Sequence, residues 1–152
     1  MLALEIPEPD VKIFMSKLLK EDIFNHFEVR GIEISSFTRL EISGELDANY
    51  LNDDERTENK FCTWAELSKY VVDFIKDGKR PRLIKIVFSL SGALIHPNAS
   101  ACFLNMNYEN NSVVFTTATA QVSFALDKSH DFAWDNYVRE FFAKNNILVH
   151  EM

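Results

Sequence analysis

The sequence predicts an α+β fold. We expect residues 1–152 to form a single domain with three amphipathic helices mainly on one face of an antiparallel sheet of five or six strands. Two patterns carry this prediction. Three segments repeat apolar residues at helical spacing, whereas several others alternate apolar and polar residues with the period of a strand. Hairpins dominate the order of these segments.

The central segment, residues 63–90, predicts a helix that leads into an interior strand. Thr63 and Glu66 have the spacing of a capping box, and apolar residues follow them at helical intervals. Pro81 cannot continue a helix, so the helix should end a few residues before it. From Arg82 onward the side chains alternate, with one wholly apolar face and one mixed face. Such a strand belongs inside a sheet whose second face is partly open.

The N-terminal part changes twice between strand and helix patterns. Residues 2–6 indicate a short first strand, and residues 11–19 predict an amphipathic helix for which Asp10 is a candidate cap. Residues 28–46 alternate apolar and polar side chains, which predicts an antiparallel hairpin with one face in water.

A second hairpin is expected farther along the chain. Residues 102–108 form one strand, Asn110 and Asn111 supply the positive φ angles of a tight turn, and the return strand begins at Val113. The apolar residues later move to even positions, which predicts a bulge or bend near residues 119–121.

The last helix should begin at Ser129 or Asp131 and end at Asn145–Asn146. Apolar residues recur at helical spacing between these positions, and polar residues occupy the opposite side. Residues 147–149 then form either a short terminal strand or a tail.

Composition and charge limit the classes of function. The chain has 16 basic and 23 acidic residues, which gives a net charge of −7. This balance disfavours general binding to nucleic acid or to anionic membranes, because both need a basic surface. The sequence shows no apolar run long enough to span a membrane and no signal-peptide pattern, so we expect a cytoplasmic protein.

Side chains that carry chemistry occur without a recognisable motif. Cys62 and Cys102 lack metal-type spacing and are expected to be reduced thiols, with Cys102 in the core. The four histidines stand outside every catalytic signature, so the catalytic residues stay unknown. Carboxylates in the loop 47–60 are candidate ligands for a divalent cation: Asp53, Asp54, Glu55 and Glu58. That loop lacks EF-hand spacing and is typical of an exposed acidic loop, so we expect no metal site and no cofactor.

Basic residues concentrate at the junction between the central helix and strand. Five of the sixteen occur within ten positions: Lys76, Lys79, Arg80, Arg82 and Lys85. Arginine forks match carboxylate and phosphate groups, so this basic corner (Lys79–Lys85) is a candidate anion-binding site. Its candidate residues are Lys79, Arg80, Arg82 and Lys85, with His96 from the next loop nearby. The alternative is a solvated helix end whose charges pair with local acids.

Three stretches carry a resemblance to a family: M-L-A-L-E-I at the start, V-K-I-F-M-S-K-L-L after it, and F-C-T-W-A-E-L-S-K-Y-V-V-D-F-I-K-D-G-K-R-P-R-L-I-K-I-V-F-S-L in the centre. In these stretches the chain resembles uncharacterised proteins of gut and soil Clostridia, a domain of unknown function. The resemblance implies a bacterial cytoplasmic protein. It supplies no activity, cofactor or catalytic residue.

The leading hypothesis for function is a non-catalytic binding or protein-interaction module. Catalytic and cofactor signatures are missing, and the mixed second face of the sheet offers a surface for a partner or a second copy: Lys85, Val87, Phe103 and Val114. The alternative is a small hydrolase or transferase that acts on an anionic small molecule at the corner Lys79–Lys85. A homodimer and a small anionic ligand are therefore the candidate partners, and a role with nucleic acid ranks third.

Overall fold

The computed structural model describes residues 1–50, 60–76 and 80–152. Within them the elements follow in this order: β1 (Ala3–Ile6), η1 (Glu8–Asp10), α1 (Val11–Lys20), β2 (Glu28–Ser35), β3 (Arg39–Ser43), α2 (Trp64–Lys76), β4 (Leu83–Ser91), η2 (Gly92–Leu94), β5 (Ala99–Glu109), β6 (Ser112–Gln121), α3 (Ser129–Lys144) and β7 (His150–Glu151). The candidate cation ligands between residues 53 and 58, and Lys79 of the basic corner, lie outside the described residues.

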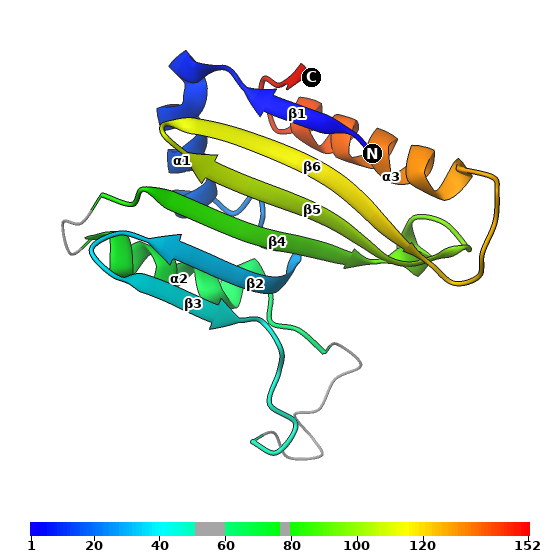
Figure 1. Cartoon of the computed structure of the whole chain (residues 1–152), viewed down its shortest axis with the longest axis horizontal. Coiled ribbons are helices and arrows are strands. Elements are labelled where there is room, and N and C mark those ends of the chain that lie inside the picture. Colours follow the sequence, from blue (N-terminus) through cyan, green and yellow to red (C-terminus); the bar gives the residue numbers. More distant parts are fainter. Residues whose placement is uncertain (51–59, 77–79) are drawn as a thin grey trace.

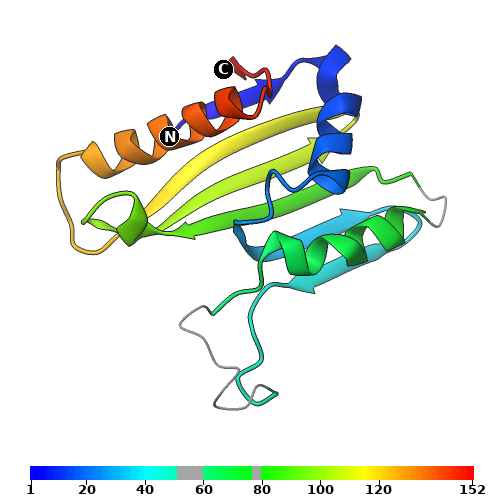
Figure 2. The same ribbon diagram turned by 180° about the vertical axis from the view of Figure 1, so that it is seen from behind.

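One antiparallel sheet runs through the molecule, with its strands in the order β3-β2-β4-β5-β6-β1-β7. Figures 1 and 2 show α1, α2 and α3 on the same face of this sheet, so in the described part of the chain the opposite face carries no α-helix. The α+β class and the three helices are confirmed. The strand number is corrected, because the described sheet has seven strands rather than five or six.

The extra strand lies at the C-terminus. β7 has only two residues, and so short a segment leaves no periodicity to recognise. It forms because the sheet edge at β1 offers free backbone groups: the Met152 N–H donates to the Ala3 carbonyl at 2.9 Å. The apolar residues 147–149 are not a strand. Instead the chain turns at Asn146, whose φ is 58°, and Ile147 enters the core.

Aromatic rings fill the layer between the helices and the sheet. Phe24, in the turn between α1 and β2, is fully buried. Its ring centroid lies 5.2 Å from that of Phe88 on β4 and 5.2 Å from that of Phe141 on α3. Burying one such side chain contributes about 2–3 kcal/mol to folding, so these rings hold helices to the sheet.

Two tryptophans in this layer also bond to the backbone. The Trp64 indole N–H of α2 donates to the Leu18 carbonyl near the end of α1 at 3.1 Å. The Trp134 indole N–H of α3 donates to the Phe103 carbonyl of β5 at 2.8 Å. A buried indole needs such an acceptor, and these bonds therefore fix where the helices sit relative to the sheet.

Both predicted hairpins are present. β2 and β3 pair antiparallel, and β5 pairs with β6. The turn of the second hairpin has Asn110 at φ 52° and Asn111 at φ 61°, the left-handed region that a tight turn requires. Tyr108, the last residue of the expected first strand, pairs with Val113, the residue at which the return strand is expected to begin.

The predicted helix caps are only partly formed. At the start of α2 the Thr63 N–H donates to Glu66 Oε1 at 3.0 Å, which is one half of a capping box. The other half is replaced, because the Glu66 N–H bonds the Thr63 carbonyl oxygen at 3.1 Å instead of the side chain. Asp10 precedes α1 but makes no side-chain cap.

The far half of β6 contacts α3 through polar side chains. Thr117 Oγ1 donates to Asp135 Oδ1 at 2.6 Å and accepts the Leu2 N–H at 2.8 Å. Thr119 Oγ1 donates to Asp131 Oδ1 at 2.5 Å. Thr117 and Asp135 are buried, and their polar atoms satisfy one another.

This polar contact explains the change in the apolar pattern of β6. Thr117 and Thr119 still face α3, so the strand does not reverse its faces. The apolar residues at even positions beyond the strand are exposed: Val122, Phe124 and Leu126. The expected irregularity lies on the neighbouring strand, where the β5–β6 register shifts between Ala99 and Ala101.

We expect Thr117→Val to lower the free energy of unfolding by about 2–4 kcal/mol, because it leaves the Asp135 carboxylate and the Leu2 N–H buried without a partner. Urea unfolding followed by circular dichroism measures this loss. Thr38→Val, in the exposed turn between β2 and β3, is the control and should change stability by no more than about 0.5 kcal/mol. Equal losses for both variants would show that the Thr117 bonds contribute nothing specific.

The two thiols should differ in reactivity. Burial, together with the Asp131 carboxylate, raises the pKa of Cys102 to about 11, and its side chain is fully buried. Burial and Glu66 also raise the pKa of Cys62, but this residue is only half-buried. Below its pKa the Cys102 thiol stays protonated and unreactive. At pH 8 we therefore expect a thiol reagent to label one cysteine per native chain and two after unfolding. Native Cys62→Ser should remain unlabelled, and rapid labelling of it would contradict this prediction.

Candidate interaction face and basic corner

The uncovered face of the sheet presents side chains that alternate with the buried ones. Four outward positions in a row on each of β5 and β6 are uncharged, and we call these eight the open face: Ala101, Phe103, Asn105, Asn107, Val114, Thr116, Ala118 and Ala120. The next outward residue of β5, Glu109, is charged and bounds this face at the hairpin turn. Lys85 and Val87 of β4 point to the same side, as do Phe103 and Val114, so the alternation placed all four candidates on one surface.

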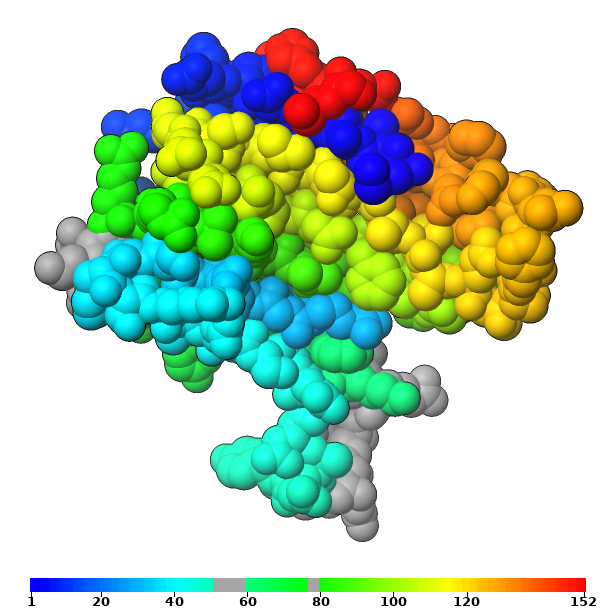
Figure 3. Space-filling model, in the orientation of Figure 1, coloured from blue at the N-terminus to red at the C-terminus, as the bar shows by residue number. Residues whose placement is uncertain are grey.

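Strand pairing arranges this surface in rows across the sheet. In one row Lys85 pairs with Asn107, Asn107 with Val114, and Val114 with Glu5 of β1. In another row Phe103 pairs with Ala118. Charged side chains therefore flank the open face on β4 and β1 but do not interrupt it. Figure 3 shows β4, β5, β6 and β1 as one broad surface.

Arg30 closes one end of this surface. It is the extra residue at the irregularity between Val29 and Gly31 on β2. Its guanidinium carbon lies 3.8 Å from the ring centroid of Phe61 and 5.1 Å from that of Phe103. Its Nε donates to Ser89 Oγ at 3.1 Å. Two aromatic faces and one hydroxyl thus fix this cation beside the uncharged residues.

The structure brings together only part of the basic corner. Arg80 and Arg82 line one depression of about 210 Å³ together with Tyr108, Asn110 and Asn111. Arg82 also pairs with Glu109 at 3.4 Å in an exposed contact. Lys85 lies three residues farther along β4, in register with Glu33. The arginines therefore share a surface, whereas Lys85 belongs to the border of the open face.

His96 is not part of the basic corner. It follows η2, beyond the end of β4, while Arg82 precedes the start of that strand. A strand of nine residues separates the two positions by about 30 Å. Of the predicted group, Arg80 and Arg82 lie together, Lys85 and His96 lie apart from them because of the alternation and length of β4, and Lys79 lies outside the described residues. Anion binding at this corner stays a prediction.

His96 instead joins a hydrogen-bonded group at the start of α3. The Asn98 N–H donates to His96 Nδ1 at 3.0 Å, so in the neutral ring Nε2 carries the proton. Nε2 then donates to Ser129 Oγ at 3.1 Å, and Ser129 Oγ donates to Asp127 Oδ2 at 3.1 Å. A nucleophilic serine needs an imidazole nitrogen that accepts its proton. In this arrangement His96 does the reverse, which makes the group a connection between η2 and α3.

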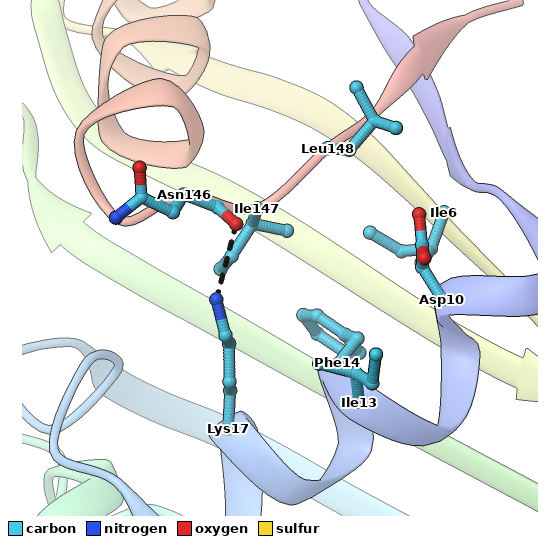
Figure 4. Close-up of a pocket in the computed structure, with 8 residues that line it drawn as sticks. All are labelled: Ile6, Asp10, Ile13, Phe14, Lys17, Asn146, Ile147 and Leu148. Carbon is cyan, nitrogen blue, oxygen red and sulfur yellow. Dashed lines mark hydrogen bonds between the residues drawn. The ribbon is translucent and has the colours of Figure 1, made fainter.

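A small apolar pocket lies between α1 and the segment that follows α3. Figure 4 shows its eight lining residues: Ile6, Asp10, Ile13, Phe14, Lys17, Asn146, Ile147 and Leu148. Its volume is about 210 Å³. Lys17 Nζ donates to the Asn146 carbonyl at 3.1 Å, as expected for a cation beside a helix C-terminus.

Sequence reasoning missed this pocket because its walls come from opposite ends of the chain. One local signal existed: Ile13 lies outside the apolar stripe of residues 11–19, and both Ile13 and Leu148 are 59% exposed. An apolar side chain away from the core face of a helix marks a second contact surface only when its tertiary neighbour is known.

The described residues contain no group of three or more His, Cys, Asp or Glu side chains arranged to hold a metal ion. No helix among them combines the length and the apolar character needed to cross a membrane.

Comparison with known proteins gives one match. A family model described as "Family of unknown function (DUF5721)" matches residues 17–150. No curated protein matches the chain, and no solved structure matches it. The predicted resemblance to a domain of unknown function is confirmed, while the bacterial, clostridial origin stays a prediction.

Proposed function

The chain belongs to the DUF5721 family, and because the description of this family assigns no activity, we propose from the geometry that the protein is a non-catalytic protein-interaction module. The open face of its sheet is the proposed docking surface. The single observation that carries the proposal is the set of eight uncharged outward positions, four in a row on each of β5 and β6.

This set is unusual for the chain in which it occurs. Lysine, arginine, aspartate and glutamate make up 26% of the residues, and sheet faces in water normally take their share of them. The centres of protein–protein interfaces are depleted in charged residues and enriched in aromatic ones. Phe103 supplies an aromatic side chain at the centre, and Lys85, Glu5 and Arg30 supply a charged rim.

The surface is also preformed. It lies on β5 and β6, which pair with each other over ten or eleven residues and are held by β4 and β1 on either side. A docking surface on interior strands loses little conformational entropy on binding, which favours stable association.

A photo-crosslinking amino acid at position 107 tests this proposal. Asn107 is exposed on the open face, and Glu140, exposed on α3, is the matched control position. We expect irradiation to give discrete adducts from position 107 and only background from position 140. Ala118→Arg should abolish the adducts without changing the circular dichroism spectrum.

The mass of the adduct identifies the partner. If the purified protein alone gives an adduct of twice the chain mass, the protein binds a second copy of itself. If an adduct of a different mass forms in a cell extract, the partner is another protein. If position 107 forms no adduct in either experiment, the proposal that the protein is an interaction module is wrong.

The second candidate function uses the basic corner and a small anionic molecule. Arg80 and Arg82 line one depression with the amides of Asn110 and Asn111, a set of donors that suits a carboxylate or phosphate. The enzymatic form of this alternative, a hydrolase or transferase, has to act without His96. Pairing of Arg82 with Glu109 weakens the site, so we expect only millimolar affinity.

Thermal unfolding in the presence of tripolyphosphate distinguishes a site from general charge. We expect the anion to raise the melting temperature of the wild type, and Arg80→Ala with Arg82→Ala to remove at least half of this rise. Lys20→Ala with Lys69→Ala, two exposed lysines on the helices, is the control with the same change in charge. The same loss in both double variants would identify a solvated helix end and no anion site.

A further inference from the structure

We propose that the partner on the open face is a second copy of this chain. The two sheets pack face to face about a two-fold axis that runs parallel to the strands between β5 and β6. This inference rests on the proposed function and names its partner. Rotation about this axis makes the surfaces of the two copies complementary in two independent features, their charge and their shape.

The first feature is the placement of opposite charges. Such an axis exchanges β5 with β6 and β4 with β1, because the sheet order is β4-β5-β6-β1. Lys85 on β4 and Glu5 on β1 belong to the same row of register partners. The axis therefore places Lys85 of each copy over the partner's Glu5, which gives two symmetric ion pairs.

Both side chains are available for this contact. Within the described part of the chain neither Lys85 nor Glu5 forms an ion pair. The acid next to Lys85 on β2, Glu33, is already paired with Arg39. An axis perpendicular to the strands would instead lay β4 over β4, so Lys85 would lose Glu5 as its partner, and an axis through the row of Lys85 would bring two lysines together and be opposed by their repulsion.

The second feature is the placement of large and small side chains. Phe103 on β5 is the largest side chain of the open face, and its register partner on β6 is Ala118, the smallest kind. Exchange of β5 with β6 puts each Phe103 ring over the partner's Ala118. In the adjacent row Asn105 and Thr116 are register partners, so the amide of one copy faces the hydroxyl of the other and can bond to it.

The available area fits a small dimer interface. The axis lays β5 over the partner's β6 along about ten residues, β4 over the four-residue β1, and β2 over the two-residue β7. At about 3.4 Å per residue and about 4.8 Å between strands, this overlap is on the order of 500 Å² per copy. Standard protein interfaces bury about 600–1,000 Å² on each partner, so the area fits a dimer whose formation depends on concentration. Two antiparallel sheets also pack face to face at a separation of about 10 Å, which is filled by side chains of the sizes found here.

Reversal of the paired charges tests the axis. Sedimentation velocity over a hundredfold range of concentration should show wild-type protein at twice the chain mass of 17.6 kDa. We expect Glu5→Lys and Lys85→Glu each to weaken dimerisation at least tenfold. The combined variant restores the pairs with reversed sign and should return the dissociation constant to within about threefold of the wild type.

Matched controls carry the same charge changes on the helical side of the molecule. Glu140→Lys on α3 and Lys69→Glu on α2 are exposed and should leave the dimer unchanged. Ala118→Arg places a large charged group under Phe103 of the other copy and should give a monomer with an unchanged circular dichroism spectrum.

Each result decides between the inference and its alternatives. A wild type that stays monomeric overturns the dimer, while adducts of another mass from position 107 would keep the interaction module. A dimer that survives Ala118→Arg and both charge reversals has its interface elsewhere, which also overturns the inference. Loss in both single variants without recovery in the combined variant overturns the proposed axis.

Discussion

The burial of Phe24 is the contact on which the arrangement of the whole chain depends. This ring comes from the short turn between α1 and β2, and it meets aromatic rings from α1, β4, β6 and α3. Each aromatic pair stabilises the fold by about 0.5–1.5 kcal/mol beyond the contribution of the apolar area that it buries. A single fully buried side chain thus connects the two terminal helices to the central strands on one side of the sheet.

The one-sided core has a direct consequence for the other side of the sheet. Since α1, α2 and α3 all cover the same face, the outward positions of β5 and β6 are left to a partner or to water (Figure 2). A face in water needs charge to stay soluble, and a docking face needs the centre free of charge. Lys85 and Glu5 stand at the borders of the surface and the eight residues between them are uncharged, which fits the second requirement.

The contact between β6 and α3 shows how a polar segment can belong to a core. In the sequence the polar residues of this contact look like surface residues: Thr117, Thr119 and Asp135. The apolar residues at even positions also suggest that the strand exchanges its buried and exposed faces. In the fold the hydroxyls and carboxylates satisfy one another across the interface. The hydropathy pattern does not identify buried residues where two partly polar surfaces bury each other. The hydrogen-bond partners of such polar residues are distant in the sequence, so no local pattern reveals them.

Part of the candidate site was open to prediction from local patterns. Alternation on β4 to β6 identified Lys85, Val87, Phe103 and Val114 as neighbours, and the Asn110–Asn111 turn set the register between β5 and β6. Proximity in sequence misled at the basic corner, because β4 carries the chain about 30 Å away from the arginines before it reaches His96. His96 therefore reached Ser129 on α3, and not the arginines.

The sequence by itself determined the elements: the three helices, the two hairpins, the Asn110–Asn111 turn and the two faces of β4 and β5. These depend on periodicity and on the φ preferences of single residues, which are local properties. Only the tertiary structure decided that β1 lies beside β6, that a two-residue β7 completes the edge, and that all the helices share one face. Those choices come from packing between segments more than a hundred residues apart, and no local pattern contains the partner.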